Sequence, residues 1–228
     1  DDGFILEGDY SQLEFRVAGF LAKDDRVYED VKNDVDVHSF TASVLEVSRQ
    51  EAKADTFKPL YGGLLGTKKQ VEYYSAFKQK YKGITRWHNN LLNEAVTHKR
   101  VTLPSGRYYN FQDVYRLRSG GVTNSTAIKN YPVQGFATAD LLPMALIKLK
   151  KLLTDNSMHS IICNTVHDSI ILDVYPTERE KAIELMKTAM LSLESECRRR
   201  YNINYDMPVG IELKIGKNWL DMKGVFNI

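Results

Sequence analysis

The chain has 228 residues, of which 43% are hydrophobic and 26% are charged. This composition is typical of a soluble globular protein, excludes an intrinsically disordered chain, and contains no apolar run long enough for a membrane-spanning helix. The charges nearly balance, with 31 basic and 29 acidic residues, so any nucleic-acid contact must come from local clusters of charge.

The first part of the chain predicts a strand followed by helices. Residues 4–8 are mostly apolar and lead to Asp9, after which apolar residues follow helical spacing from Leu13. Mostly helical sequence is expected from about residue 37 to residue 98. Within it, Pro59 should kink or end a helix, because proline lacks the backbone donor.

The second part predicts a helix over about 134–153 and then a β-hairpin. The β-rich runs 160–166 and 169–174 are separated only by a two-residue turn that contains Asp168. Residues 211–215 alternate as a last strand. Strands at both ends of the chain and helices between them predict an α+β fold with an inserted, mainly helical domain.

Three smaller features carry predictions of their own. The run Thr177 to Glu180 has the pattern of a capping box and predicts the start of a helix there. Cys163 lies on an apolar strand and is expected to be a small buried side chain. Tyr73 and Phe77 are expected in a helical core rather than on a base-stacking surface.

Asp9 and Asp168 each stand at the end of a predicted strand. If the two strands are neighbours in one sheet, their carboxylates converge, and such a pair can hold Mg²⁺ for in-line phosphoryl transfer. The alternative is that each aspartate caps a turn. Spacing alone leaves both interpretations open.

A second set of side chains recurs every four residues: Arg49, Lys53, Phe57 and Tyr61. On a helix this spacing makes a slowly turning stripe. Two cations, an aromatic ring and a phenol could hold a triphosphate and stack a base. The alternative is a solvated basic edge beside core aromatics.

Four segments together resemble the family A DNA polymerases, the DNA polymerase I group. They lie in the order of that family and cover nearly the whole chain. They are the run from Asp9 to Arg16, similar to the first catalytic motif; Arg49 to Gly62, similar to the fingers-helix motif; Asn130 to Gly135, similar to the minor-groove segment; and Val166 to Asp168, similar to the third motif.

The resemblance implies an antiparallel-sheet palm and an inserted, mainly helical fingers domain. The palm is expected at residues 1–23 and 119–228 and the fingers at residues 24–118. The thumb and the 3′→5′ exonuclease of the family are expected to be absent from this chain. A second polypeptide is therefore expected to carry the thumb and possibly the exonuclease.

The resemblance also implies a role for each matching residue in binding metal and nucleotide. Asp9 and Asp168 would bind two Mg²⁺ ions, with the Tyr10 carbonyl as a further ligand. Arg49 and Lys53 would bind the triphosphate of the incoming dNTP, and Lys53 could protonate the departing pyrophosphate. The remaining residues of the expected dNTP site are His38, Phe57, Gln12 and Glu14.

The same resemblance implies contacts with primer–template DNA. Tyr61 would lie at the templating position and His167 at the primer terminus. Asn130 and Gln134 would donate to minor-groove acceptors that every correct base pair offers. In this family a glutamate at the position of Glu14 excludes a 2′-hydroxyl, which implies deoxynucleotides and argues against an RNA polymerase.

Three positions depart from the family pattern. Ser169 stands where a glutamate usually follows the third-motif aspartate, Lys58 replaces a glycine, and Thr126 replaces a basic residue. The leading interpretation is a DNA polymerase fragment in the cytoplasm of a bacterium or of a virus-infected host cell. The alternative is a non-catalytic DNA-binding or assembly subunit derived from a polymerase.

Overall fold

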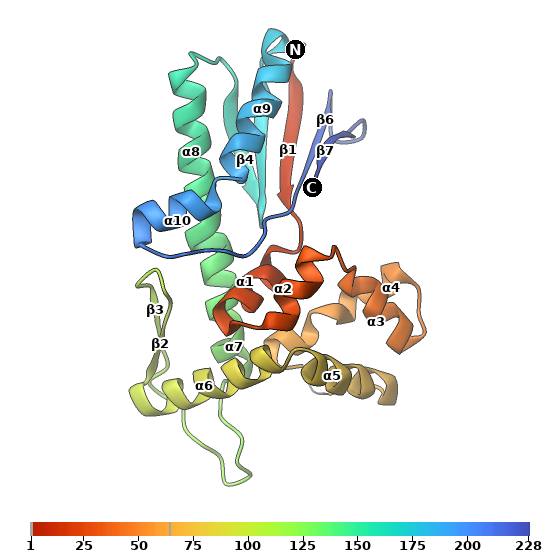
Figure 1. Cartoon of the computed structure of the whole chain (residues 1–228), viewed down its shortest axis with the longest axis vertical. Coiled ribbons are helices and arrows are strands. Elements are labelled where there is room, and N and C mark those ends of the chain that lie inside the picture. Colours follow the sequence, from red (N-terminus) through yellow and green to blue (C-terminus); the bar gives the residue numbers. More distant parts are fainter. Residues whose placement is uncertain (1, 64) are drawn as a thin grey trace. The chain divides into compact units, whose positions relative to one another are not determined.

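The computed structural model describes residues 2–63 and 65–228. The chain forms two compact units (Figure 1). Unit 1 comprises Asp1–Leu13 and Phe136–Ile228, and unit 2 comprises Glu14–Gly135. In the described part of the chain, no helix combines the length and the apolar composition needed to cross a membrane.

Unit 1 is built on a five-stranded sheet in which every neighbouring pair is antiparallel. The fold is therefore α+β, as the sequence predicts. The predicted hairpin is present, because the two strands from its halves pair around a two-residue turn. In spatial order the strands are β4 (Ile161–Val166), β5 (Ser169–Val174), β1 (Phe4–Tyr10), β6 (Ile211–Gly216) and β7 (Lys223–Asn227).

Helix α9 (Arg179–Met190) packs on β1 and β6. The strand β1 alternates, so Leu6 and Tyr10 are buried towards this helix and Asp9 lies on the opposite face of the sheet. A Cβ at Gly8 would lie 2.5 Å from the Met190 sulfur. The helix can therefore approach the strand closely only because residue 8 has no side chain. The other helical segments of unit 1 are α8 (Leu142–Asp155), η3 (Pro176–Glu178) and α10 (Leu193–Tyr201).

Unit 2 is mainly helical, and aromatic side chains form much of its core. Tyr73, Phe77 and Tyr81 are all buried, which confirms that the first two are core residues. The helix expected to end near Pro59 does end there. Helix α4 stops at Thr56, and Pro59 lies in the short 3₁₀ helix that follows. The elements of unit 2 are α1 (Leu13–Ala22), α2 (Asp25–Lys32), α3 (Val37–Leu45), α4 (Arg49–Thr56), η1 (Lys58–Tyr61), α5 (Lys68–Lys80), α6 (Lys82–His98), β2 (Arg100–Thr102), β3 (Tyr108–Asn110) and α7 (Ser125–Gln134).

The chain passes from α7 to α8 through a π-helix, η2 (Gly135–Leu141). This wider turn lies where the chain leaves unit 2 for unit 1, and such π segments are frequent at functional sites. The two units divide the chain at other positions than the expected domain limits. Those limits were expected after residues 23 and 118, whereas nearly all of α1 and the whole of α7 belong to unit 2.

Two predictions from the sequence are wrong. Cys163 is exposed rather than buried, because β4 is an edge strand of the sheet. The expected capping box is absent: α9 begins at Arg179 and no side chain caps it. The Glu178 carboxylate instead accepts hydrogen bonds from the backbone N–H groups of His159 and Ser160, each at 2.8 Å.

Candidate active site

The structure places Asp9 and Asp168 at the same end of two neighbouring strands. Asp9 is opposite Ser169 in the β1–β5 ladder, and Asp168 directly precedes Ser169 in the turn. Burial and then the nearby Asp168 carboxylate raise the pKa of Asp9 to about 6. Burial also raises the pKa of Asp168. Two half-buried carboxylates in this arrangement destabilise one another, and a bound cation would relieve that cost.

Further charges lie on the same face of the sheet. Glu212 is opposite Asp9 in the β1–β6 ladder, and its carboxylate pairs with Lys214 at 2.8 Å. Glu7 and Glu212 both raise the pKa of Asp9, while Lys214 lowers it. The sequence reasoning missed Glu212, although the alternation of residues 211–215 puts its side chain on the polar face of the last predicted strand.

The oxygen atoms around Asp9 suit a hard cation. Across residues 2–63 and 65–228, no group of three or more His, Cys, Asp and Glu side chains is arranged to hold a metal ion. Mg²⁺, however, is commonly held by one or two carboxylates together with substrate phosphates and water. The carboxylates of Asp9 and Asp168 fit that pattern.

The other predicted residues of unit 1 lie next to this pair in the chain. The Tyr10 hydroxyl donates to the Met190 carbonyl at 2.9 Å and is buried, so only the main-chain carbonyl of Tyr10 is a possible metal ligand. Gln12 and His167 both have left-handed backbone conformations, and His167 is exposed in the β4–β5 turn. The Ser169 hydroxyl donates to the Val166 carbonyl at 3.0 Å.

In unit 2 the structure brings together four residues of the predicted nucleotide site. The His38 and Phe57 rings are 5.3 Å apart in an edge-to-face arrangement. Burial, Arg49 and Lys53 lower the pKa of His38, although Asp36 opposes them, so the ring is neutral near pH 7. The His38 Nδ1 lies 3.0 Å from a threonine hydroxyl at the end of α4.

Arg49 has a partner that the sequence reasoning missed. Its guanidinium donates to the Asp36 carboxylate, which also accepts from the His38 N–H at 3.0 Å at the start of α3. Burial opposes ionisation of Asp36, but these hydrogen bonds and the charge of Arg49 hold its pKa well below the usual range. Lys53 is exposed and forms no ion pair with any residue that the structure describes.

The remaining predicted residues lie elsewhere in unit 2. The Tyr61 hydroxyl and the Asn130 Oδ1 are buried, and neither has a hydrogen-bond partner among the described residues. Their elements, η1 and α7, pack against each other. Gln134 is the exposed last residue of α7, and Glu14 is half-buried in the first turn of α1.

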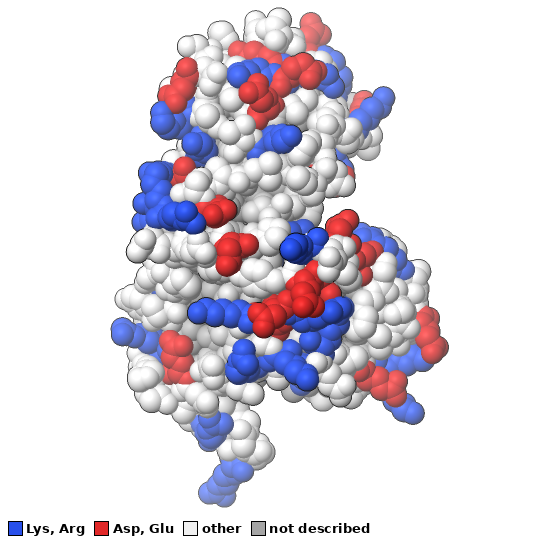
Figure 2. Space-filling view, in the orientation of Figure 1, with Lys and Arg blue, Asp and Glu red and all other residues white. Residues whose placement is uncertain are grey.

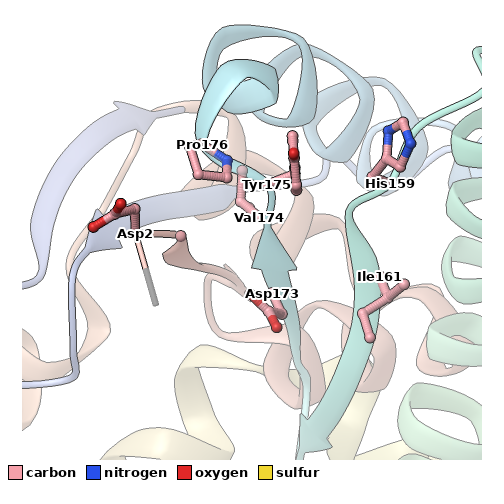
Figure 3. A pocket seen from close by; sticks show the side chains of 8 residues that line it. Asp2, His159, Ile161, Asp173, Val174, Tyr175 and Pro176 are labelled. Carbon is pink, nitrogen blue, oxygen red and sulfur yellow. The ribbon is translucent and has the colours of Figure 1, made fainter.

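A cavity of about 390 Å³ lies at the other end of the unit 1 sheet (Figure 3). Its lining includes Asp2, His159, Asp173 and Tyr175. The β1–β5 register separates this end from Asp9 by roughly 17 Å along the strand. The cavity is therefore distinct from the Asp9–Asp168 pair.

Basic and acidic side chains are interspersed on the face of the molecule that Figure 2 shows. This distribution agrees with the net charge of +2. On this face, charges of the two signs therefore largely offset each other at longer range.

Comparison with known proteins identifies close similarities to bacterial polymerases. DNA polymerase I of Lactococcus lactis subsp. cremoris is 32% identical over 249 aligned positions, which cover 97% of this chain and 26% of that protein. DNA polymerase I of Bacillus caldotenax is 28% identical over 248 positions, with the same two coverages. The chain thus spans about a quarter of the length of these curated relatives.

The fold has a counterpart among solved structures. The POL domain of Pol1 from M. smegmatis, in complex with DNA primer-template and dNTP, superposes with a TM-score of 0.77 over 95% of this chain and 40% of that one, at 23% identity. The family model described as DNA polymerase family A matches residues 1–221. Since this match extends over nearly the whole sequence, the chain belongs to DNA polymerase family A.

Proposed function

We propose that this chain is the catalytic part of a DNA polymerase, which adds deoxynucleotides to a primer 3′-hydroxyl under the direction of a template. The observation that carries the proposal is the pair Asp9 and Asp168, two half-buried carboxylates on adjacent strands whose pKa values are both raised. A purely structural sheet gains nothing from this mutual repulsion.

The two aspartates and the Tyr10 carbonyl are the proposed ligands of two Mg²⁺ ions. When bound, such ions lower the pKa of the primer hydroxyl and neutralise charge on the leaving phosphates. The carboxylates fix the position of the reacting groups, and catalysis then depends mainly on alignment and charge neutralisation.

The cluster in unit 2 is the proposed nucleotide site. Arg49, held in place by Asp36, would bind the triphosphate as a fixed donor. Lys53 is exposed and has no ion-pair partner among the described residues, so it is available both to contact the phosphates and to protonate the departing pyrophosphate. The neutral His38 ring would donate to a phosphate oxygen, and Phe57 would stack on the incoming base. Gln12 and Glu14 complete the proposed dNTP site, Glu14 by excluding a 2′-hydroxyl.

The proposed DNA contacts come from both units. Asn130 and Gln134 on α7 would donate to minor-groove acceptors, which reads the shape of a correct pair without reading its sequence. Tyr61 would lie at the templating base and His167 at the primer terminus.

Primer extension with Mg²⁺ and dNTPs tests the proposal. Asp168→Asn should reduce extension about a thousandfold, because it removes a charge on which the transition state depends. Asp173→Asn is the matched control: it is the same change near the other end of β5 and should leave extension unchanged. Duplex binding by the wild type without any extension would instead favour the non-catalytic DNA-binding subunit.

Phe57→Tyr tests the nucleotide pocket separately. In family terms a phenylalanine at this position discriminates against dideoxynucleotides, so the wild type should incorporate them poorly and the variant should incorporate them well. Chain-terminator incorporation relative to dNTP incorporation measures this. Equal use of terminators by the two proteins would contradict the assignment of Phe57 to the sugar and base of the nucleotide.

We also propose that a second polypeptide, carrying a thumb, completes the duplex-binding surface. Affinity for DNA depends on the sum of phosphate contacts, so a second wall should strengthen binding by orders of magnitude. Purification of the chain from its native cell, followed by extension assays with and without any co-purifying chain, tests this. Full processive synthesis by the isolated chain would refute it.

A further inference from the structure

Two lysines in unit 2 are half-buried without a counterion. Lys78 lies on α5 and Lys129 on α7, and the side chain of neither forms an ion pair or a hydrogen bond with any described residue. Burial lowers the pKa of both, and the charge of Lys78 lowers that of Lys129 further. A lysine removed from water normally acquires an acidic partner, so this arrangement costs stability.

A buried histidine is close enough to the same two lysines for their charges to lower its pKa. His88 on α6 is only 8% exposed, and the Leu60 carbonyl accepts a hydrogen bond from its ring. Burial, Lys129 and Lys78 lower the pKa of His88 to about 3, so the ring is neutral. Its Nε2 has no partner among the residues that the structure describes. The two cations and this unpartnered polar atom therefore mark one polar site between three helices.

The backbone of η1 and of the residue after it forms one wall of this site. Gly62 has a φ of +86°, and a Cβ there would lie 2.9 Å from the Lys129 Nζ. The Lys129 side chain therefore lies directly against residue 62, where the positive φ independently favours glycine. The preceding residue is Tyr61, whose buried hydroxyl also has no partner in the described structure.

We propose that Lys78 and Lys129 together bind one phosphate group, at a site bordered by His88 and Gly62. A phosphate supplies the negative charge that the two ammonium groups lack, and its several oxygens can accept from both. We assign the phosphate to the backbone of a single-stranded nucleic acid, because the site adjoins the proposed templating residue Tyr61. That assignment rests on the proposed function, whereas the phosphate site itself rests only on the geometry of unit 2.

Binding of a fluorescent single-stranded oligodeoxynucleotide, measured by anisotropy at several salt concentrations without dNTP or divalent ions, tests the proposal. Lys78→Met and Lys129→Met should each reduce the slope of log affinity against log salt by about 0.7, the value for one phosphate on a single strand. Because both lysines hold the same phosphate, the double variant should reduce the slope no further.

The matched control is the double variant of Lys68 and Lys82 to methionine, which removes two exposed lysines from unit 2. Its slope should equal that of the wild type. An unchanged slope in the Lys78 and Lys129 variants, or an equal fall in the control, overturns the proposal. Thermal unfolding without ligand provides a second readout: the midpoint of Lys129→Met should rise, since an unpaired charge has been removed, and a fall together with an unchanged slope identifies a structural lysine.

Inorganic phosphate distinguishes the two sources of the ligand. Suppose that inorganic phosphate raises the unfolding midpoint of the wild type but not of the double variant, and that the salt slope of oligonucleotide binding is the same in both proteins. The site then binds free phosphate, and its assignment to a nucleic-acid strand is wrong. Asp168→Asn separates this proposal from the proposed function, since it should reduce extension about a thousandfold and keep the wild-type slope. A wild type that shows the slope change but no extension would contradict the proposed function alone.

Discussion

The two ends of the sheet in unit 1 treat carboxylates in opposite ways. At one end, Asp9 and Asp168 lie at the ends of adjacent strands; burial raises the pKa of both, and the Asp168 carboxylate raises that of Asp9 further. At the other end, Glu178 accepts hydrogen bonds from the backbone and side chains of His159 and Ser160. Although burial opposes ionisation there, these bonds lower the pKa of Glu178 to about 2.

The difference separates carboxylates that build the fold from carboxylates that are available to a ligand. Glu178 has satisfied its oxygens within the protein and joins the start of β4 to the segment before α9. The Asp9 carboxylate instead lowers the stability of the fold, as groups at functional sites commonly do. Carboxylates at the two ends of the sheet therefore serve two roles, and the direction of the pKa shift tells them apart.

The largest expected effect is on primer extension. Asp9→Asn and Asp168→Asn should each reduce the rate about a thousandfold, and the double variant should lose little more, because residues that act as one unit are not additive. Glu178→Gln, assayed at a temperature at which it is folded, should retain the wild-type rate. Additive losses at Asp9 and Asp168 would show that the two aspartates do not share a task.

The next effect is on stability at the Glu178 end. Glu178→Gln should lower the free energy of unfolding by about 2 kcal/mol at pH 7, since an ionised acceptor of several hydrogen bonds is lost. The folded pKa is below the ordinary value of 4.5, so this contribution is present above pH 4.5 and disappears as the pH falls towards 2.

Urea denaturation of wild type and variant across that pH range measures the effect. The two stability curves should converge at the acid end. Glu180→Gln, which alters an exposed residue of α9, should stay within about 0.5 kcal/mol of the wild type. Curves that remain parallel down to pH 2 would show that the contribution does not depend on ionisation of Glu178, and coincident curves would show that its hydrogen bonds add no stability.

A smaller effect of the opposite sign is expected at the Asp9 end. In metal-free buffer at pH 8, Asp168→Asn should raise the free energy of unfolding by about 1 kcal/mol, because it removes one of two repelling charges near the solvent. Urea denaturation in the presence of a chelator measures this. If Asp168→Asn instead lost as much stability as Glu178→Gln, the carboxylates at the two ends of the sheet would not differ in their effect on stability.

The smallest effect concerns Glu212 and Lys214. Glu212→Gln would release Lys214 to interact with Asp9, and the Mg²⁺ concentration needed for half-maximal extension should rise about threefold, or ~0.6 kcal/mol. Lys214→Met should shift that concentration in the opposite direction. A titration of extension rate against Mg²⁺ measures both, and shifts of the same sign would show that the pair does not tune Asp9.

Much of the Asp9 end could be predicted because its signals are local. An apolar run before Asp9 and a two-residue turn at Asp168 define the strand ends, but the sequence alone left open whether the two strands are neighbours, and the antiparallel pairing of β1 with β5 answers that question. The end of α4 before Pro59 was predictable for the same reason, since proline acts on its own helix.

The features that were missed depend on strand order and on contacts between distant segments. Glu178 matches a local capping pattern, yet the backbone donors of residues 159 and 160 compete for its carboxylate. The exposure of Cys163 follows from the position of β4 at the sheet edge, which no local pattern reveals. The meeting of Lys78 and Lys129 likewise requires the packing of three helices, which hydrophobic periodicity alone does not specify.

The close approach of α9 to β1 has a consequence for genetic screens. Any side chain at Gly8 would collide with Met190 and Leu213, and the displaced strand would carry the neighbouring Asp9 with it. A collection of inactive mutants should therefore include changes at codon 8 that remove no reactive group. Second-site substitutions that replace Met190 with a shorter side chain should restore activity to some of these mutants. Such a rescue would show that the mutant is inactive because its strand is displaced and not because a reactive group is lost.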